Sequence, residues 1–167
     1  KTFLQERGIP VGPFMDVPDE ATAKKAGEAL GYPYVLKARS GGYDGKGNCT
    51  VASVSEIPEA MAKLGGAKLY AEGFVTFEKE LAVVAVRSLA GDIRTYPVVE
   101  TIHENHICVT VMAPAQVPAN VREKAQALAA RIMDAFHGAG VFGIEMFLHD
   151  GEVLVNEIAP RVHNSGH

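Results

Sequence analysis

The sequence lacks several features that mark common classes of protein. It has no excess of positive charge, because its formal net charge is −4 at pH 7, whereas nucleic-acid-binding domains usually present a basic face. It has no apolar run as long as a membrane span and no recognisable signal peptide. We therefore expect no nucleic-acid partner and no membrane partner.

Cysteine is scarce, and only Cys49 and Cys108 are present. Both lie in runs that are typical of strands. Two cysteines are enough for one disulfide, but two buried thiols are the interpretation that we favour. We therefore expect a reducing compartment, the cytoplasm.

What is present is typical of a globular protein. Of the 167 residues, 47% are hydrophobic and 22% are charged, which is enough for one domain or for two small lobes. The chain begins with Lys1 rather than methionine, and we expect it to be a piece of a longer protein.

The hydrophobic pattern predicts an α+β fold made of two mixed α/β lobes. The pattern changes near residues 73–76, so we expect a small lobe over 1–72 and a larger lobe over 73–167. In the small lobe we predict the end of a helix over 1–7, helices over 19–30 and 56–64, and strands over 34–37, 49–52 and 68–72. In the larger lobe we predict strands over 80–89, 92–101 and 107–112, a helix over 121–136, and a hairpin of 141–148 with 152–158.

Residues 40–47 form a glycine-dense segment, with four glycines in eight positions. Glycines cost backbone entropy and bury little surface, so this density is explained if main-chain N–H groups close around a phosphate chain. Lys37 and Lys46 flank the segment and supply positive charge. The alternative, a mobile hairpin turn, is about equally well supported, and the spacing is not that of a Walker A loop. A phosphate-binding segment of this kind is expected to be mobile without nucleotide.

Two glutamates interrupt the apolar strands of the last predicted hairpin. Glu145 and Glu157 lie in otherwise apolar runs, and Asn156 precedes the second. Charged groups in such runs need partners or face a site, and Mg²⁺ prefers a few carboxylate oxygens together with substrate phosphates. We favour a magnesium site over the alternative, a solvent-facing edge of the sheet.

Register decides whether these two carboxylates meet. A plain two-residue turn at Asp150 and Gly151 would place Glu145 opposite Asn156, with Glu157 on the other face. A three-residue loop or a bulge would set Glu145 opposite Glu157, and we predict such an irregularity. Without a metal the two charges would repel each other, and we expect one of the two pKa values to rise.

Polar side chains also crowd the segment after Pro160, where Arg161, His163, Asn164 and Ser165 lie close together. Their donor groups suit a small oxyanion, and the alternative is an ordinary polar loop.

Nearer the start of the chain, two glutamates flank the predicted junction between the lobes. Glu72 and Glu80 are positioned to serve a nucleotide there, with Glu80 accepting from ribose hydroxyls, and the alternative is a pair of ordinary charged strand ends.

Together these segments resemble the ATP-grasp family, and within it the carboxyaminoimidazole ribonucleotide synthases, which in fungi form the front part of phosphoribosylaminoimidazole carboxylase. The resemblance covers essentially the whole chain. It is carried by residues 41–47, by 72–75 with Glu80, by 156–161 and by the ending 163–167. One departure is Val162, which stands where the family usually has proline.

The resemblance implies a role for each matching position, with Mg-ATP held between the two lobes. Phosphate contacts are implied for Lys37, Gly42, Tyr43, Asp44, Gly45, Lys46 and Gly47, and Tyr43 and Asp44 would approach the ribonucleotide substrate. Adenine contacts are implied for Glu72, Phe74 and Val75, a ribose contact for Glu80, and positions near the nucleotide for His103 and Asn156. Magnesium would be held by Glu145 and Glu157, and bicarbonate by the catalytic residues Arg161, His163, Asn164 and Ser165.

The reaction implied by the resemblance is an ATP-dependent carboxylation in purine biosynthesis. ATP would phosphorylate bicarbonate to carboxyphosphate, whose carboxyl group passes to the amine of 5-aminoimidazole ribonucleotide. The resemblance also implies a homo-oligomeric parent protein. Two alternatives stay open: another ATP-grasp carboxylate ligase, against which the ending 163–167 argues, and a nucleotide-binding module without catalysis.

Overall fold

This computed structural model describes residues 1–41, 47–104 and 107–166. The chain divides into two compact units. The smaller contains Gly12–Val75, and the larger contains Lys1–Val11, Thr76–Glu104 and the chain from Cys108 onward. Each unit has its own sheet and its own apolar core, so each is described by itself below.

The smaller unit is a four-stranded antiparallel sheet with helices packed against it. The strand order is β1-β4-β2-β3. Buried side chains of α2, α3 and the strands, among them Ala26, Leu36 and Ile57, form the core. The elements are β1 (Phe14–Val17), α2 (Glu20–Leu30), β2 (Tyr34–Ala38), β3 (Asn48–Val51), η1 (Val54–Glu56), α3 (Ile57–Lys63) and β4 (Leu69–Gly73).

Local sequence signals explain where α2 begins and ends. Asp19 caps its start, because the side chain accepts a hydrogen bond from the backbone N–H of Thr22 at 2.7 Å. Gly31 follows its end with a positive φ of 82°, a conformation that glycine adopts at little cost. The predicted helix over 19–30 is therefore confirmed.

Strand β1 is an element that the sequence pattern did not predict. It has only four residues, and prolines stand on either side of it at Pro13 and Pro18. Its order comes from β4, with which it pairs in antiparallel register from Phe14 opposite Glu72 to Val17 opposite Leu69. A strand this short shows too little alternation to be recognised in the sequence.

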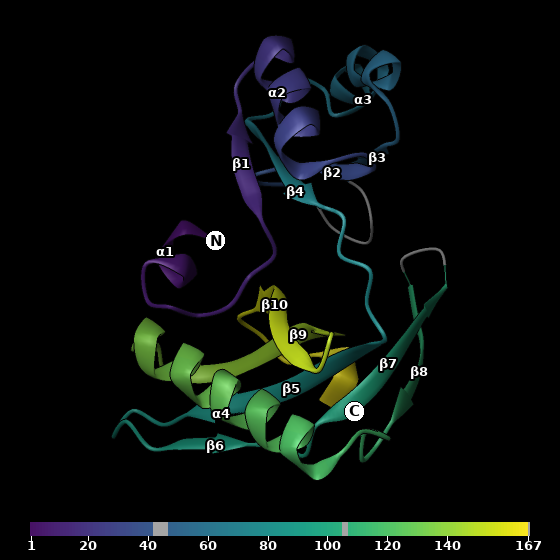
Figure 1. The fold of residues 1–167 in the computed structure, drawn as a ribbon. Helices are drawn as coiled ribbons and strands as arrows, with labels where there is room; N and C mark the ends of the chain where they lie inside the picture. Colours follow the sequence, from purple (N-terminus) through teal and green to yellow (C-terminus); the bar gives the residue numbers. More distant parts are fainter. Residues whose placement is uncertain (42–46, 105–106, 167) are drawn as a thin grey trace. The chain divides into compact units, whose positions relative to one another are not determined.

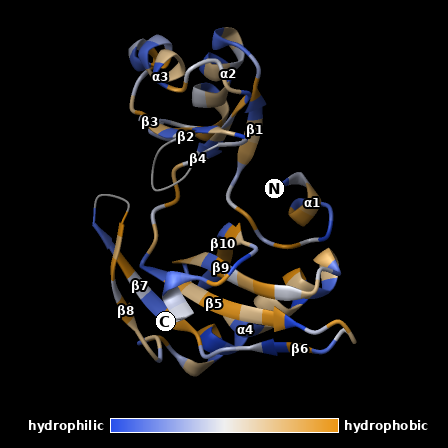
Figure 2. Ribbon diagram, turned by 180° about the vertical axis from the view of Figure 1, so that it is seen from behind, coloured by the Kyte–Doolittle hydropathy of each residue, from blue (hydrophilic) through white to orange (hydrophobic). Residues whose placement is uncertain are grey.

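The larger unit is a six-stranded sheet with α4 packed along one face (Figure 1). The strand order is β10-β9-β5-β7-β8, and β6 also pairs with β5. The central β5 is strongly apolar over much of its length (Figure 2). The elements are α1 (Thr2–Gln5), β5 (Lys79–Arg87), β6 (Ile93–Thr95), β7 (Val99–Glu104), β8 (Ile107–Met112), α4 (Ala119–Phe136), β9 (Gly140–His149), β10 (Glu152–Ala159) and η2 (Asn164–Gly166).

The two faces of the larger sheet differ in chemistry. Side chains alternate between faces along a strand, and Leu81, Val83 and Ala85 of β5 lie in the core that α4 covers. Ile144 and Met146 of β9 belong to the same core. The residues between them therefore point to the opposite face, away from α4.

The prediction of one strand over 92–101 is wrong in one respect, because the structure has two strands there, β6 and β7. Pro97 lies between β6 and β7 and has no N–H to donate to a neighbouring strand. Both pieces still pair with β5, and between them the N–H of Tyr96 donates to the carbonyl of Val84 at 2.8 Å. The chain therefore stays hydrogen-bonded to β5 before and after the break between β6 and β7.

The sequence pattern placed the first eleven residues in the small lobe, and the structure differs on this point. They belong to the larger unit. Leu4 and Ile9 are buried in its core. The N–H of Val155 donates to the carbonyl of Pro10 at 2.9 Å, and Val11 forms a bridge with Val155. These partners lie far away in the sequence, so local periodicity could not reveal them.

Other predicted elements are present, with ends that shift by a few residues. The helix predicted over 121–136 is α4, and His137, which follows its last residue, has a positive φ of 54°. The strands on either side of 73–76 belong to different sheets, as expected for two lobes. In the part of the chain that the structure describes, no helix combines the length and apolarity needed to cross a membrane.

Candidate active site

The hairpin of β9 and β10 brings the two predicted metal ligands opposite each other. A two-residue turn at Asp150 and Gly151, both with positive φ, pairs His149 with Glu152. The register then shifts between Val155 and Glu157, and from there Glu145 pairs with Glu157. The predicted register is confirmed, and it arises from a bulge rather than from a longer turn.

Asn156 is the extra residue of this bulge. In a bulge of this kind two residues of one strand oppose a single residue of the other, so Asn156 and Glu157 both stand opposite Glu145. Ala82 of β5 pairs with Glu145 on its other side. These residues therefore lie on the face of the sheet that α4 does not cover.

The same face carries the predicted ribose-binding residue. Glu80 lies two residues before Ala82 on β5 and pairs with Thr101 of β7. Two positions after Thr101, His103 forms a hydrogen bond through Nδ1 with Oε2 of Glu80. Sequence reasoning named both residues but not their contact, which holds the Glu80 carboxylate in one place.

Glu145 has an imidazole neighbour that changes its charge behaviour. His163 Nε2 lies 3.3 Å from Glu145 Oε1. This interaction is the largest influence on the pKa of Glu145, and with His103 and Arg161 it lowers that pKa against the opposing effect of burial. The expected rise in one of the two pKa values is therefore not found at Glu145, because the hydrogen bond with His163 outweighs the effect of burial.

The four residues predicted to hold an oxyanion fall into two pairs. Arg161 and Asn164 are exposed. His163 and Ser165 are buried, with only 7% and 5% of their surfaces exposed. Ser165 Oγ lies 2.8 Å from His163 Nδ1, so the buried pair is joined by a hydrogen bond while the other two side chains face solvent.

The donor set on this face fits magnesium better than a metal held by protein alone. Among the residues that the structure describes, no group of three or more His, Cys, Asp or Glu side chains is arranged to hold a metal ion. Two opposed carboxylates with an amide beside them offer a few hard oxygen ligands. That is the donor set expected where substrate phosphates complete the coordination of Mg²⁺.

In the smaller unit, the predicted phosphate lysine is held by a carboxylate. Lys37 Nζ lies 2.8 Å from Oε2 of Glu72. Lys37 is on β2 and Glu72 is on β4, where it pairs with Val35. Glu72 is only 8% exposed, so the ion pair fixes the direction of the lysine side chain. Sequence reasoning treated these two residues as separate contacts.

The predicted adenine residues continue from β4. Phe74 is 51% exposed and Val75 is half-buried. The N–H of Gly73 donates to the carbonyl of Pro13 at 2.8 Å, which ties this end of β4 to β1.

Of the predicted phosphate loop, Gly47 has a positive φ of 104°, and its carbonyl accepts from the N–H of Ala38 at 2.8 Å. The other predicted loop residues, Gly42, Tyr43, Asp44, Gly45 and Lys46, lie outside the described residues.

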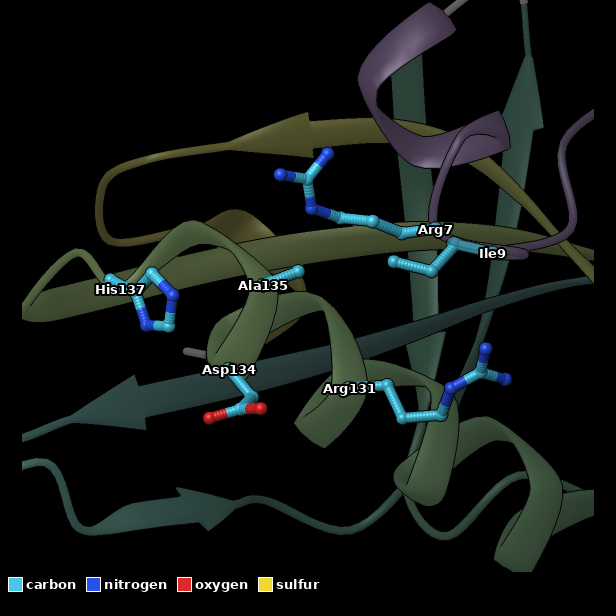
Figure 3. A pocket seen from close by; sticks show the side chains of 6 residues that line it. All are labelled: Arg7, Ile9, Arg131, Asp134, Ala135 and His137. Carbon is cyan, nitrogen blue, oxygen red and sulfur yellow. The ribbon is translucent and has the colours of Figure 1, made fainter.

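A shallow cavity of about 290 Å³ lies elsewhere on the larger unit, beside α1 and the end of α4. In Figure 3 the guanidinium groups of Arg7 and Arg131 point in different directions rather than converging. Each donates to a backbone carbonyl, Arg7 to Phe3 and Arg131 to Gly8. No residue predicted for the site lines this cavity, and we assign it no chemical role.

The ATP-grasp domain family matches residues 2–167. The chain belongs to the ATP-grasp family. This ATP-grasp chain is 49% identical to phosphoribosylaminoimidazole carboxylase of Schizosaccharomyces pombe, covering 100% of the chain and 31% of that protein. It is 40% identical to N5-carboxyaminoimidazole ribonucleotide synthase of Synechococcus elongatus, covering 100% of the chain and 42% of that protein. The chain thus spans less than half of the length of either relative.

Solved structures are similar in fold as well. The carboxyaminoimidazole ribonucleotide synthase of Aspergillus clavatus, complexed with ATP, matches with a TM-score of 0.94 and 44% identity, over 99% of this chain and 44% of that one. A second structure from this fungus contains ADP and 5-aminoimidazole ribonucleotide, with a TM-score of 0.91 and 42% identity over the same shares. Biotin carboxylase from Campylobacter jejuni, at 20% identity and a TM-score of 0.88, shares the fold.

Sequence reasoning missed several neighbours of the site in this ATP-grasp chain. Gly143 lies directly against the side chain of His163. A glycine inside an apolar strand often marks a place where another group approaches the backbone closely, and this signal was available in the sequence. Partial burial raises the pKa of Cys108, and the negative charge of Glu145 raises it further. The expectation of two buried thiols is wrong, because Cys49 and Cys108 are both free and partly exposed.

Proposed function

We propose that this chain is the ATP-binding core of a carboxyaminoimidazole ribonucleotide synthase. The parent protein would use ATP to join bicarbonate to the amine of 5-aminoimidazole ribonucleotide. The observation that carries the proposal is the bulge at Asn156, which sets Glu145 opposite Glu157 on the sheet face that also bears Glu80 and His163. Identity along the whole chain, at 40% to an N5-carboxyaminoimidazole ribonucleotide synthase and at 49% to a phosphoribosylaminoimidazole carboxylase, supports it.

Nucleotide binding is assigned to residues of both units. In the smaller unit, Lys37 would contact the phosphates, and the exposed ring of Phe74 with Val75 would contact the adenine. In the larger unit, Glu80 would accept from the ribose hydroxyls, with its carboxylate oriented by His103. ATP and ADP in the similar structures from Aspergillus clavatus support these assignments.

Magnesium is assigned to Glu145 and Glu157, with Asn156 beside them. Bound there, the ion would supply positive charge to the phosphate oxygens. The protein's part is to hold the two carboxylates on one face through the bulge. Glu145 stays ionised to low pH because His163 lowers its pKa.

Bicarbonate is assigned to the segment that follows β10. Arg161 and Asn164 are exposed there and offer donors to an oxyanion. Bicarbonate oxygen would attack the γ-phosphorus of ATP, giving carboxyphosphate and ADP. The amine of the ribonucleotide would then attack the carboxyl carbon, and phosphate would leave with the C–O bond electrons as the amine loses a proton.

The test is ADP release by the full-length parent protein with Mg²⁺. We expect release to be stimulated by bicarbonate and by 5-aminoimidazole ribonucleotide together. Glu145→Gln and Glu157→Gln should each lower kcat about 100-fold or more, because metal charge stabilisation is worth several kcal/mol. Glu152→Gln is the matched control on the same hairpin, because Glu152 is exposed and its carboxylate forms an ion pair with Lys124. This variant should leave the rate near that of the wild type.

Other outcomes would overturn the proposal in distinguishable ways. Stimulation by a different carboxylate, with no effect of bicarbonate, would identify another ATP-grasp ligase. Tight ATP binding without ADP release under any of these conditions would identify a nucleotide-binding module. A homo-oligomeric parent stays a prediction, which its molar mass in solution would test.

A further inference from the structure

The ring of His163 rests directly on the backbone of β9 at Gly143. A Cβ atom placed on Gly143 would lie 2.3 Å from Cγ, 2.5 Å from Cβ and 2.7 Å from Cδ2 of His163. Real carbon atoms do not approach so closely, so any side chain at this position would displace the ring. Gly143 is buried and lies two residues before Glu145 on the same strand, so it faces the same side of the sheet.

The contacts of His163 indicate which ring nitrogen carries the proton. The backbone N–H of Ser165 points to Nδ1 at 3.4 Å, and a backbone N–H can only donate. Nδ1 is therefore an acceptor, and Ser165 Oγ–H donates to it as well at 2.8 Å. The proton of the neutral ring then lies on Nε2, which faces Glu145 Oε1 at 3.3 Å. That distance is slightly longer than a typical N–H···O hydrogen bond.

A second close approach fixes the rest of the segment. A Cβ on Gly166 would lie 2.8 Å from Cγ2 of Val84, on the neighbouring strand β5. The N–H of Gly166 donates to the carbonyl of His163 at 3.0 Å. The segment from His163 to Gly166 is thus seated on the sheet at two points where the lack of a side chain permits contact.

We propose that Gly143, His163 and Ser165 act together to position the carboxylate of Glu145. Gly143 provides the space for the ring, Ser165 selects the tautomer, and His163 donates from Nε2 to Oε1. Both ring nitrogens are engaged and the ring is buried, so His163 has no donor left for bicarbonate. His163 and Ser165 are therefore positioning residues, and Arg161 and Asn164 contact the anion. What Glu145 does once positioned rests on the proposed function.

Activity of the parent protein tests the positioning role. His163→Ala should weaken the apparent affinity for Mg²⁺ about 10- to 100-fold, the usual loss when a group that orients a ligand is removed. His163→Gln, whose amide can still donate toward Glu145, should recover most of that loss. If His163 contacts bicarbonate instead, both variants will raise KM for bicarbonate with little change in the Mg²⁺ dependence, and the proposal fails.

A double-mutant cycle tests whether Gly143 acts through the ring. Gly143→Ala should weaken the apparent Mg²⁺ affinity in the wild type but have little further effect in His163→Gly, which removes both the ring and the His163 Cβ that would lie 2.5 Å from the new methyl group. Gly138→Ala is the matched control, because a Cβ there makes ordinary contact at 3.4 Å with Phe142. Equal losses from Gly143→Ala in both backgrounds would contradict the proposal.

A further measurement does not depend on ATP, metal or bicarbonate. With ¹⁵N-labelled histidine, the side-chain nitrogen shifts of His163 in the metal-free parent protein should report a neutral ring protonated at Nε2. Ser165→Ala removes the closer of the two donors to Nδ1 and should shift them part of the way toward a mixture of tautomers, because only the backbone N–H at 3.4 Å then remains. A ring protonated at Nδ1 in the wild type would overturn the proposal even if the enzyme is a synthase. The expected tautomer in a protein without synthase activity would instead leave the positioning intact and refute the proposed function.

Discussion

At the scale of single residues, the ion pair of Lys37 with Glu72 shows how a binding lysine is held ready. Lys37 lies near the end of β2, and its ammonium group meets a carboxylate of the adjacent strand at 2.8 Å. A long lysine side chain otherwise loses much rotamer freedom when it binds a ligand. Holding the lysine beforehand lowers that cost, which is the general advantage of preorganisation.

We predict that Lys37→Ala weakens ATP binding to the parent protein by about 1.5–3 kcal/mol, the range for hydrogen bonds to charged groups. The loss should exceed that of Lys46→Ala, because β2 fixes the direction of Lys37. Calorimetric titration of both variants with ATP measures the order. Lys24→Ala is the control, since Lys24 forms a surface pair with Glu20 in which both side chains are 49% exposed. A larger loss for Lys46→Ala would refute the prediction.

At the scale of elements, the β9–β10 hairpin separates two tasks. The turn at Asp150 and Gly151 reverses the chain, and the bulge at Asn156 sets the register of the carboxylates. Gly151 has a positive φ of 72°, and a Cβ there would meet nothing within 4 Å. Changes at the turn should therefore affect stability through backbone conformation alone.

We predict that Gly151→Ala lowers the free energy of unfolding by about 1 kcal/mol, the cost of a positive φ for alanine. The apparent Mg²⁺ affinity of the parent protein should not change, because the bulge still sets Glu157 opposite Glu145. Chemical denaturation and a Mg²⁺ titration measure the two quantities. A loss of Mg²⁺ affinity as large as that of Glu157→Gln would mean that the turn sets the register after all.

The packing of α2 on β2 provides a pH-dependent element. Tyr34 is fully buried, its hydroxyl donates to the carbonyl of Ala23 at 3.1 Å, and burial raises its pKa to about 12. The folded-state pKa therefore lies above the ordinary value of about 10. The contribution of this hydroxyl to stability is fully present below pH 10 and is lost as pH rises from about 10 toward 12.

Comparison of the wild type with Tyr34→Phe tests this behaviour. At pH 7 the variant should be less stable by about 1 kcal/mol, the usual net value of one hydrogen bond. Above pH 10 the difference should shrink and then reverse, because only the wild type gains from ionising Tyr34 in the unfolded state. Denaturation curves at pH 7, 9, 10 and 11 provide the measurement. A difference that stays constant through pH 11 would contradict the raised pKa.

At the scale of the whole molecule, each unit has a core of its own. Among the described residues of 12–75, ten apolar residues form a buried core, including Val17, Tyr34 and Ile57. Domains of about 60 residues are marginal but often fold alone. The first eleven residues contribute Leu4 and Ile9 to the other core.

We predict that a polypeptide of residues 12–75 folds by itself and that extending it to residues 1–75 adds no stability. Circular dichroism and the dispersion of amide NMR signals measure folding, and denaturation compares the two lengths. The reverse experiment removes residues 1–11 from the whole chain and should destabilise the larger unit, because Leu4 and Ile9 leave its core. A longer polypeptide that is clearly more stable than 12–75 would place the first residues with the smaller unit.

Much of this protein was accessible from sequence because the signals were local. Helix α2 has its cap at Asp19 and its stop at Gly31, and both act on neighbouring residues. The apolar runs around Glu145 and Glu157, with a turn of known length between them, limited the hairpin to two registers. The motifs of the ATP-grasp family predicted the remaining candidate site positions. Each of these signals depends on residues that lie within one element or one hairpin.

Tertiary structure alone decided the contacts between residues that are distant in the chain. It formed β1 against β4, brought residues 1–11 to the larger unit, joined Lys37 to Glu72 and seated His163 on Gly143. It also brought His163, from a later segment, to Glu145, where the hydrogen bond between them lowers the pKa of that carboxyl group. Periodicity tells which face a side chain occupies, whereas its partner depends on how separate elements pack, and that is a property of the folded chain.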